Sequence, residues 1–276
     1  LFRSQALGVD MPMEILNCQT WTAGHALVAE SLQRGRVFLI GDAAHLFTPT
    51  GGLGYNTGVE DAVNLGWKLA ATLRGQAGLG LLDSYELERK PLALRNTGYA
   101  RQFADSVGLF PATPELEADS ESGRVLREQA GQHFNAHVRL EFNIPGVTFG
   151  GRYDASPVIA PDPAPSPPDQ ANTYVPSAKP GGRPPHAWLP DGRSLYDTFG
   201  RDWTLLVLHL EPNSLQAWRD SAAQRGLQFT AVEMDDHTLR DLYQAPLTLI
   251  RPDQIVGWRG DASTPPDEVW QQVLGQ

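Results

Sequence analysis

The sequence contains a single cysteine, Cys18. A disulfide framework, a cysteine-based zinc site and a Cys-x-x-Cys redox pair are therefore excluded within the chain, and a reducing cytoplasm is the expected compartment. Basic residues are too few for a nucleic-acid protein: the formal net charge of −10 argues against nucleic-acid phosphates and anionic membrane surfaces as partners. Long apolar runs are also lacking, so we expect neither a membrane span nor a signal peptide.

Proline divides the chain unevenly. Ten of the 22 prolines lie between residues 155 and 185. Each proline fixes φ and removes a backbone donor, so this stretch should be neither helix nor central strand. We therefore expect three parts: residues 1–150, a proline-rich linker over residues 151–185, and a second folded unit over residues 186–276.

The second unit alternates between strand and helix patterns. An apolar strand pattern covers residues 203–210, and a helical pattern with Leu215, Trp218 and Ala222 on one side follows over residues 214–225. After these come a strand over residues 227–234, a hairpin over residues 246–260 that turns at Pro252-Asp253, and a final helix with Thr264 as cap and Pro265 as first residue. This order predicts a compact α/β domain.

A glycine-rich stretch stands out in the first unit, "GDAAHLFTPTGGLGYNTG" over residues 41–58. An apolar, strand-like run over residues 36–40 precedes it. A helical pattern follows, which we expect to begin near Asn56 with Glu60 and Asp61 in its first turn. Strand, tight glycine loop and helix bring a ligand against unpaired backbone amides, where an anion or a polarised oxygen is favoured.

The loop does not match a nucleotide-phosphate motif. It lacks GxxxxGK[ST], and its glycines at positions 52, 54 and 58 do not have the GxGxxG spacing. Asp42 would repel a phosphate, but it suits a sugar hydroxyl, to which a carboxylate offers strong acceptors. The residues therefore predict a ligand with a polyol part near Asp42 and a flat, electron-accepting part over the glycines. A flavin has both parts.

The stretch resembles the second flavin motif of the FAD-dependent aromatic hydroxylases, the single-component flavoprotein monooxygenases of the phenol and polyketide hydroxylase type. The motifs "GRVFLIGDAAH" and P-x-x-G-x-G-x-N-x-G-x-x-D-A-x-N-L-x-W-K-L-A match without a gap over residues 36–70. "LLDSYELERKP" and segments after residue 151 resemble later parts of these enzymes. The resemblance implies an α/β fold: the C-terminal part of a flavin-binding, Rossmann-like and substrate domain, followed by a thioredoxin-like domain without CxxC.

The resemblance also implies roles for six residues toward the cofactor FAD. Asp42 would bond the ribityl chain, Pro49 would lie beside the reactive edge of the ring, and Gly52 and Gly54 would allow close approach. The amides of Tyr55 and Asn56 would face the flavin O2 atom. In this family NADH or NADPH reduces FAD, O2 then gives a flavin hydroperoxide, and a phenolic or polycyclic aromatic substrate is hydroxylated.

Two departures from the family pattern leave alternatives open. The GxGxxG strand–helix unit and the Asp-Gly motif of the family are not in this sequence, so we expect a missing N-terminal half and would not expect the chain alone to hold FAD tightly or to turn over. A non-catalytic fragment or assembly module that no longer binds FAD is the main alternative. Epoxidation or Baeyer–Villiger insertion on the same scaffold is another. The oligomeric state is open, with a homodimer as one option.

For several other residues a purely structural role has to be weighed against a functional one. His45 is expected to be a structural loop histidine satisfied by backbone, and Cys18 a small buried hydrophobic residue. Trp21 and Phe47 suit an aromatic substrate pocket and a core position about equally. His133 and His137 are four residues apart, but no third metal ligand is signalled and metal binding is not expected.

Overall fold

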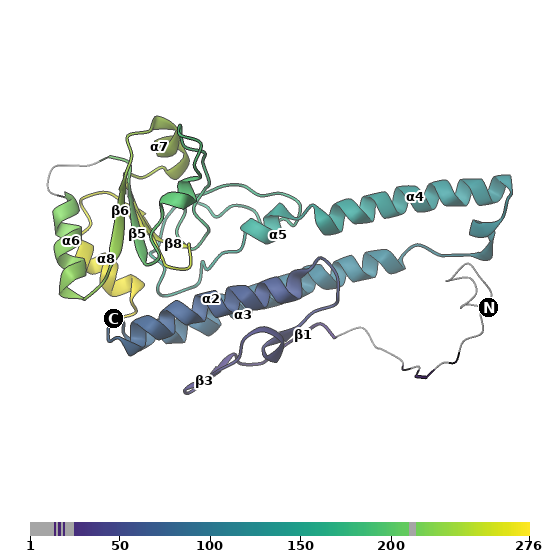
Figure 1. Cartoon of the computed structure of the whole chain (residues 1–276), viewed down its shortest axis with the longest axis horizontal. Helices are drawn as coiled ribbons and strands as arrows, with labels where there is room; N and C mark the ends of the chain where they lie inside the picture. Colours follow the sequence, from purple (N-terminus) through teal and green to yellow (C-terminus); the bar gives the residue numbers. More distant parts are fainter. Residues whose placement is uncertain (1–13, 15, 18, 20–24, 210–213) are drawn as a thin grey trace.

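The computed structural model describes residues 14, 16–17, 19, 25–209 and 214–276. Cys18 and Trp21, whose burial and role were predicted above, lie outside the described residues. The described chain is elongated: long helices extend to one side, and a small mixed sheet with its covering helices forms a rounded body at the other end (Figure 1). Both helix and strand are present, as the α/β prediction requires.

Two long helices form the base of the first part. Helix α2 (Leu53–Leu73) and helix α3 (Leu79–Gly108) lie side by side, and a short loop joins them. The 3-10 turn η2 (Pro114–Glu117) follows, and helix α4 (Glu121–Phe142) runs back toward the sheet, where the short helix α5 (Pro145–Phe149) ends this part (Figure 1). The side chain of Ser120 caps α4 by accepting a hydrogen bond from the amide of Gly123.

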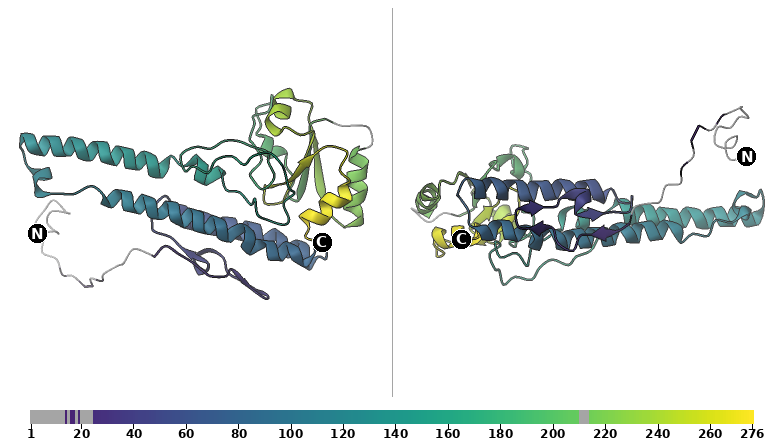
Figure 2. Two further views of the ribbon diagram at one scale, coloured as in Figure 1. Left: turned by 180° about the vertical axis from the view of Figure 1, so that it is seen from behind. Right: turned by 90° about the horizontal axis from the view of Figure 1, so that it is seen from below.

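Short strands lie across the α2–α3 pair, as the view from below shows (Figure 2). Strand β1 (Leu27–Val28) pairs with β4 (His45–Leu46), and β2 (Gln33–Arg34) pairs with β3 (Val37–Phe38); the 3-10 turn η1 (Gly41–Ala43) stands between β3 and β4. The predicted buried strand over residues 36–40 is therefore only two residues long. Its expected burial was wrong, because Val37 is 64% exposed and, within the described residues, β3 pairs with β2 alone.

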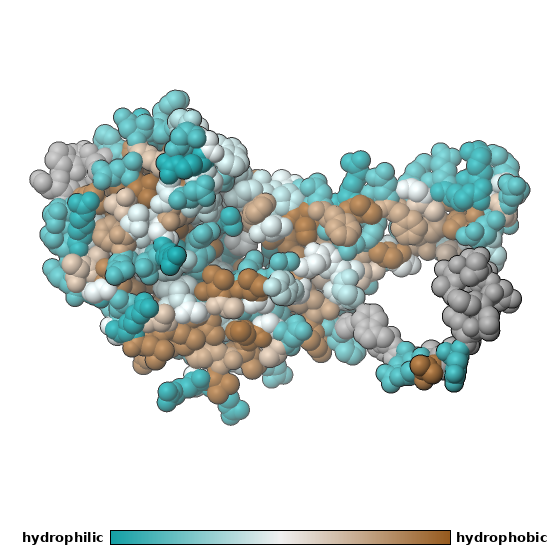
Figure 3. Space-filling model, viewed as in Figure 1, coloured by the Kyte–Doolittle hydropathy of each residue, from teal (hydrophilic) through white to brown (hydrophobic). Residues whose placement is uncertain are grey.

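Helix α2 differs from its prediction in two ways. It begins at Leu53 rather than near Asn56, so no acidic residue lies in its first turn. Its buried face carries polar side chains, including those of Asp61, Asn64 and Lys68, whereas the apolar Val59 and Val63 are exposed. Apolar side chains also cover much of the surface in the region of α2, α3 and the short strands (Figure 3). Periodicity alone therefore predicted the helix but not its inward face.

The C-terminal sheet has the strand order β6-β5-β7-β8. Strand β5 (Trp203–Val207) is parallel to β6 (Phe229–Glu233) and antiparallel to β7 (Leu247–Ile250), which forms the predicted hairpin with β8 (Val256–Gly260). This is the thioredoxin-like arrangement. The described residues contain no cis peptide bond, so Pro246, which directly precedes β7, is trans.

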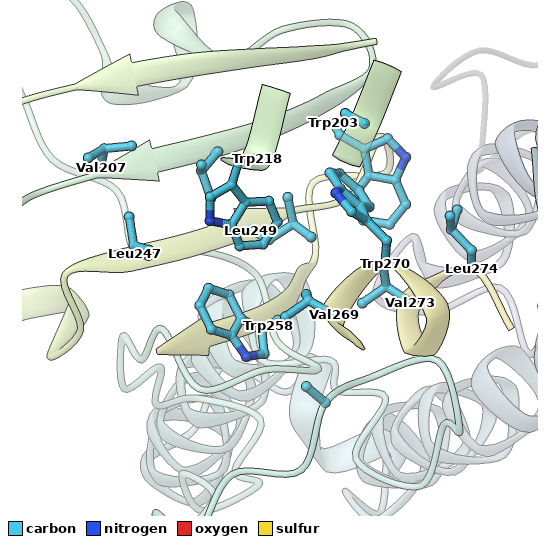
Figure 4. Packing of buried hydrophobic residues seen from close by; sticks show 13 residues of the cluster. Trp203, Val207, Trp218, Leu247, Leu249, Trp258, Val269, Trp270, Val273 and Leu274 are labelled. Carbon is cyan, nitrogen blue, oxygen red and sulfur yellow. The ribbon is translucent and has the colours of Figure 1, made fainter. Parts of the chain in front are cut away.

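Helices cover both faces of this sheet. Helices α6 (Ser214–Gln224) and α8 (Pro266–Val273) pack on one face, where Trp203, Trp218 and Trp270 meet (Figure 4). Helix α7 (His237–Tyr243) and the 3-10 turn η3 (Leu195–Thr198) pack on the other. Burial on both faces explains why all five residues of β5 are buried and all but Thr204 are apolar. The predicted cap of α8 was wrong: Pro265 is the N-cap residue, and Thr264 makes no capping bond.

The proline-rich stretch over residues 155–185 contains no helix and no strand, as its prolines predict. It is nevertheless tied to its neighbours by backbone hydrogen bonds. Ala160 donates to Gly257 of β8, and Gly181 donates to Val256 and accepts from Tyr153, at 2.8 Å in each case. The segment is therefore tied to β8 near each of its two ends. Within the described residues, none of the helices combines the length and apolarity needed to cross a bilayer.

Candidate functional site

The glycine turn ahead of α2 is open to solvent. Gly51 and Gly52 have φ angles of +65° and +64°, a left-handed conformation that glycine adopts without steric cost. Gly52 is the N-cap of α2, no side chain caps this helix start, and a Cβ built on Gly52 would meet no atom within 4 Å. The first amides of a 21-residue helix therefore face an unobstructed surface, with the positive end of the helix dipole behind them.

Asp42 lies beside this helix. It belongs to η1, which packs against α2 so closely that a Cβ on Gly58 would lie 3.1 Å from the Cα of Gly41. The side chains of Asp42 and Pro49 are exposed, and Tyr55 is 83% exposed. The loop from residue 41 to residue 52 thus presents a carboxylate, a proline and an uncapped helix start toward solvent.

One of the six predicted residues, Asn56, is placed differently from the expectation. Because α2 begins at Leu53, the backbone amide of Asn56 already belongs to the hydrogen-bonded helix, and its side-chain Nδ2 donates to the carbonyl of Gly52 at 2.7 Å. The unpaired amides are those of the preceding residues, Tyr55 included. A Cβ on Gly54 would be in ordinary van der Waals contact with Phe47, 3.4 Å away, so packing within the chain does not itself require a glycine at this position.

A buried polar cluster lies behind the loop and was not predicted from the sequence. Asp61 is completely buried and accepts hydrogen bonds from the amide of Gly41 at 3.0 Å, from His45 Nε2 at 2.6 Å and from Arg89 Nε at 2.7 Å. His45 is therefore structural, as expected, but its partner is a carboxylate and not the backbone. Burial works to raise the pKa of Asp61, whereas the bond from His45 and the charge of Arg89 lower it below its ordinary value.

The cluster continues from Arg89 to its neighbour on α3, Glu88. This buried carboxylate accepts from Lys68 Nζ at 2.7 Å, from Arg251 Nη1 and Nη2 at 2.7 and 2.9 Å, and from Ser156. Burial works to raise the pKa of Glu88, but Arg251 and Lys68 lower it well below its ordinary value. Burial also lowers the pKa of Lys68 to about 8. One side chain of α3 thus joins α2, the proline-rich segment and the β7–β8 turn.

The sign of these shifts predicts acid sensitivity. Because the folded-state pKa of Glu88 is lower than its ordinary value of 4.5, the stabilisation it provides is fully present above that value and is lost as the pH falls. We expect the free energy of unfolding, measured by urea titration, to decrease between about pH 5 and about pH 3. The Glu88→Gln variant should lose part of this dependence. An unchanged pH slope in that variant would contradict the assignment.

The geometry fits a flavin. An uncapped helix start suits an oxygen that gains negative charge, and the exposed Gly52, whose Cβ would meet no atom within 4 Å, leaves space for a flat ring. The exposed Asp42 carboxylate, on the η1 turn that packs against α2, can accept hydrogen bonds from hydroxyl groups. His137 does not form a metal site with His133. His137 pairs with Glu141 at 2.6 Å, and His133 donates to the carbonyl of Ser106.

Family comparisons identify the class of protein. The FAD binding domain family matches residues 3–99, and the family "Aromatic-ring hydroxylase, C-terminal" matches residues 177–276. The chain thus belongs to the FAD-dependent aromatic hydroxylases, as the motif over residues 36–70 indicated.

Individual relatives agree with this assignment. "FAD-dependent monooxygenase apdD" of Emericella nidulans is 34% identical in an alignment 279 positions long, which covers 95% of this chain and 44% of that protein. "Aklavinone 12-hydroxylase RdmE" of Streptomyces purpurascens is 34% identical over 92% of this chain and 46% of its own length. The chain spans about half the length of the curated relatives it matches.

Solved structures show the same fold. The rebeccamycin biosynthetic enzyme RebC with reduced flavin superposes with a TM-score of 0.81 at 37% identity, over 91% of this chain and 47% of RebC. A ternary complex of aklavinone-11 hydroxylase with FAD and aklavinone gives a TM-score of 0.74 at 31% identity, over all of this chain and 50% of that one.

Proposed function

We propose that this chain supplies the ribityl and isoalloxazine contacts of an FAD- and NAD(P)H-dependent monooxygenase that hydroxylates a phenolic or polyketide aromatic ring. The observation that carries the proposal is the uncapped start of α2 at the exposed Gly52, together with the exposed Asp42 on the η1 turn that packs against the same helix. The relatives in the comparisons, which include a phenol 2-monooxygenase and aklavinone hydroxylases, support the substrate class.

Each residue of the site has a defined task in this proposal. Asp42 accepts hydrogen bonds from ribityl hydroxyls, and Pro49 lies beside the ring. Gly52 and Gly54 allow the ring to come close to the backbone. The helix start, including the amide of Tyr55, stabilises negative charge on the ring oxygen, and Asn56 holds the turn through its bond to Gly52. Bound FAD, once reduced by NADH or NADPH, supplies the activation of O2.

We also propose that residues 1–150 and 186–276 are separate structural units joined by the 151–185 linker. The second unit is redox-silent because it contains no cysteine, so thiol chemistry of the thioredoxin type is not available to it. Its role in this proposal is to support the first unit through the contacts of Arg251 with Glu88.

The test is to titrate FAD into the purified chain, alone and after co-expression with the portion of a relative that this chain does not span. We expect a flavin absorption spectrum from the co-expressed assembly, and NAD(P)H oxidation that depends on an added phenol or polyketide. A colourless, FAD-indifferent assembly would refute the proposal and favour a non-catalytic assembly module. Product analysis would separate ring hydroxylation from epoxidation or Baeyer–Villiger insertion.

A further inference from the structure

Both ends of the loop that carries Asp42 and Pro49 are fixed by buried carboxylates from other elements. At one end, the amide of Gly41 donates to Asp61 Oδ2 of α2 at 3.0 Å. At the other end, the amide of Gly51 donates to Glu141 Oε1 of α4 at 2.7 Å. Between these two points β4 pairs with β1 and Thr50 Oγ1 donates to the carbonyl of Ala100, whereas the side chains of Asp42 and Pro49 are exposed.

The two carboxylates share a second feature. Each is hydrogen-bonded to Nε2 of a histidine at 2.6 Å, Asp61 to His45 and Glu141 to His137. The side chain of Asp61 is fully buried and that of Glu141 is 10% exposed, so water competes little for these bonds. A carboxylate that also pairs with a histidine cannot rotate away from the amide without losing the histidine bond as well. The histidine therefore holds the carboxylate in place as an acceptor for the loop amide.

We infer that Asp61 and Glu141 are positioning residues that hold the loop from Gly41 to Gly51 in its flavin-ready shape before any flavin binds. This inference rests on the proposed function for its link to flavin. Its physical basis is preorganisation: a loop that is ordered in advance loses less conformational freedom when the ligand arrives. Neither carboxylate is needed to touch the flavin.

The variants Asp61→Asn and Glu141→Ala test the inference. An asparagine that keeps its oxygen toward Arg89 turns its NH2 group toward the amide of Gly41, so that two donors face each other. Glu141→Ala leaves the Gly51 amide without its acceptor. Matched controls lie on the same helices: Glu60→Gln removes a partner of Arg89 that makes no bond to the loop, and Glu128→Gln changes an exposed acid of α4.

Hydrogen–deuterium exchange of the flavin-free chain gives the first readout. Loss of one hydrogen bond should speed exchange of peptides covering residues 41–51 by up to about tenfold in Asp61→Asn and Glu141→Ala, and not in the controls. Unchanged exchange in folded variants would overturn the inference. If Asp61→Asn does not fold, as judged by circular dichroism, Glu141→Ala and its control decide the question at the Gly51 end.

FAD titration of the same variants in the co-expressed assembly gives the second readout. We expect affinity to fall by up to about tenfold in the two loop variants. A loosened loop with wild-type affinity would overturn the positioning role. If the wild-type assembly binds no flavin, the proposed function fails, whereas the exchange measurement still decides whether the two carboxylates hold the loop.

Discussion

Replacement of Glu88 by glutamine is expected to lower the free energy of unfolding by about 3–5 kcal/mol. Glu88 is fully buried and is the shared counter-charge of Lys68 and Arg251, both of which are also fully buried. An amide of the same size cannot neutralise two cations, and one of its groups would be a donor placed against other donors. Urea titration followed by circular dichroism at neutral pH measures the change as a shift of the midpoint.

The control for this experiment is Asp83→Asn on the same helix. Asp83 is exposed, so its replacement should change the free energy of unfolding by no more than about 0.5 kcal/mol. A Glu88→Gln variant as stable as the wild type would show that water or rearranged partners satisfy Lys68 and Arg251. That result would remove Glu88 as the link between the two parts of the chain.

The second prediction concerns flavin affinity and rests on the proposed function. Asp42→Ala should weaken FAD binding roughly 10- to 100-fold, because hydrogen bonds from ribityl hydroxyls to a carboxylate are stronger than those between neutral groups. Asp42→Asn keeps one acceptor and should lie between the alanine variant and the wild type. Fluorescence titration of FAD into the co-expressed assembly measures all three constants.

Asp42 is exposed in the flavin-free chain, so its replacement should leave the urea midpoint unchanged. This separates a binding effect from an effect on folding. Equal FAD affinity of Asp42→Ala and wild type would contradict the ribityl contact, and with it the interpretation of the loop. Asp83→Asn again serves as the control for the loss of one surface charge.

The sequence predicted the C-terminal sheet well because its signals are local. Strand β5 is apolar except for Thr204, helix α6 repeats Leu215, Trp218 and Ala222 on one side, and Pro252-Asp253 marks a hairpin turn. Helix α7 has only seven residues and was not predicted. The cap of α8 was assigned one residue early because Pro265 and Pro266 both suit a helix start.

The candidate site was predictable only in part. The glycine motif and Asp42 lie within one short segment, so their proximity follows from the sequence. The partners that hold the loop do not: Glu141 is 90 residues from Gly51, and Arg251 is 163 residues from Glu88. Apolar periodicity could not predict the inward face of α2 either, because Asp61 and Lys68 are buried only when partners from α3 neutralise them. No local pattern contains that information.

The contact between Arg251 and Glu88 has a consequence for cutting the chain. A protease cleaving among the prolines, or a gene split there, would not yield two self-sufficient pieces. The upstream piece would keep the buried carboxylate of Glu88 without its counter-ion Arg251. The downstream piece would keep the buried guanidinium of Arg251, still paired with Asp253 but no longer with Glu88. We therefore expect the two products to stay associated after nicking, and each to be far less soluble when expressed separately.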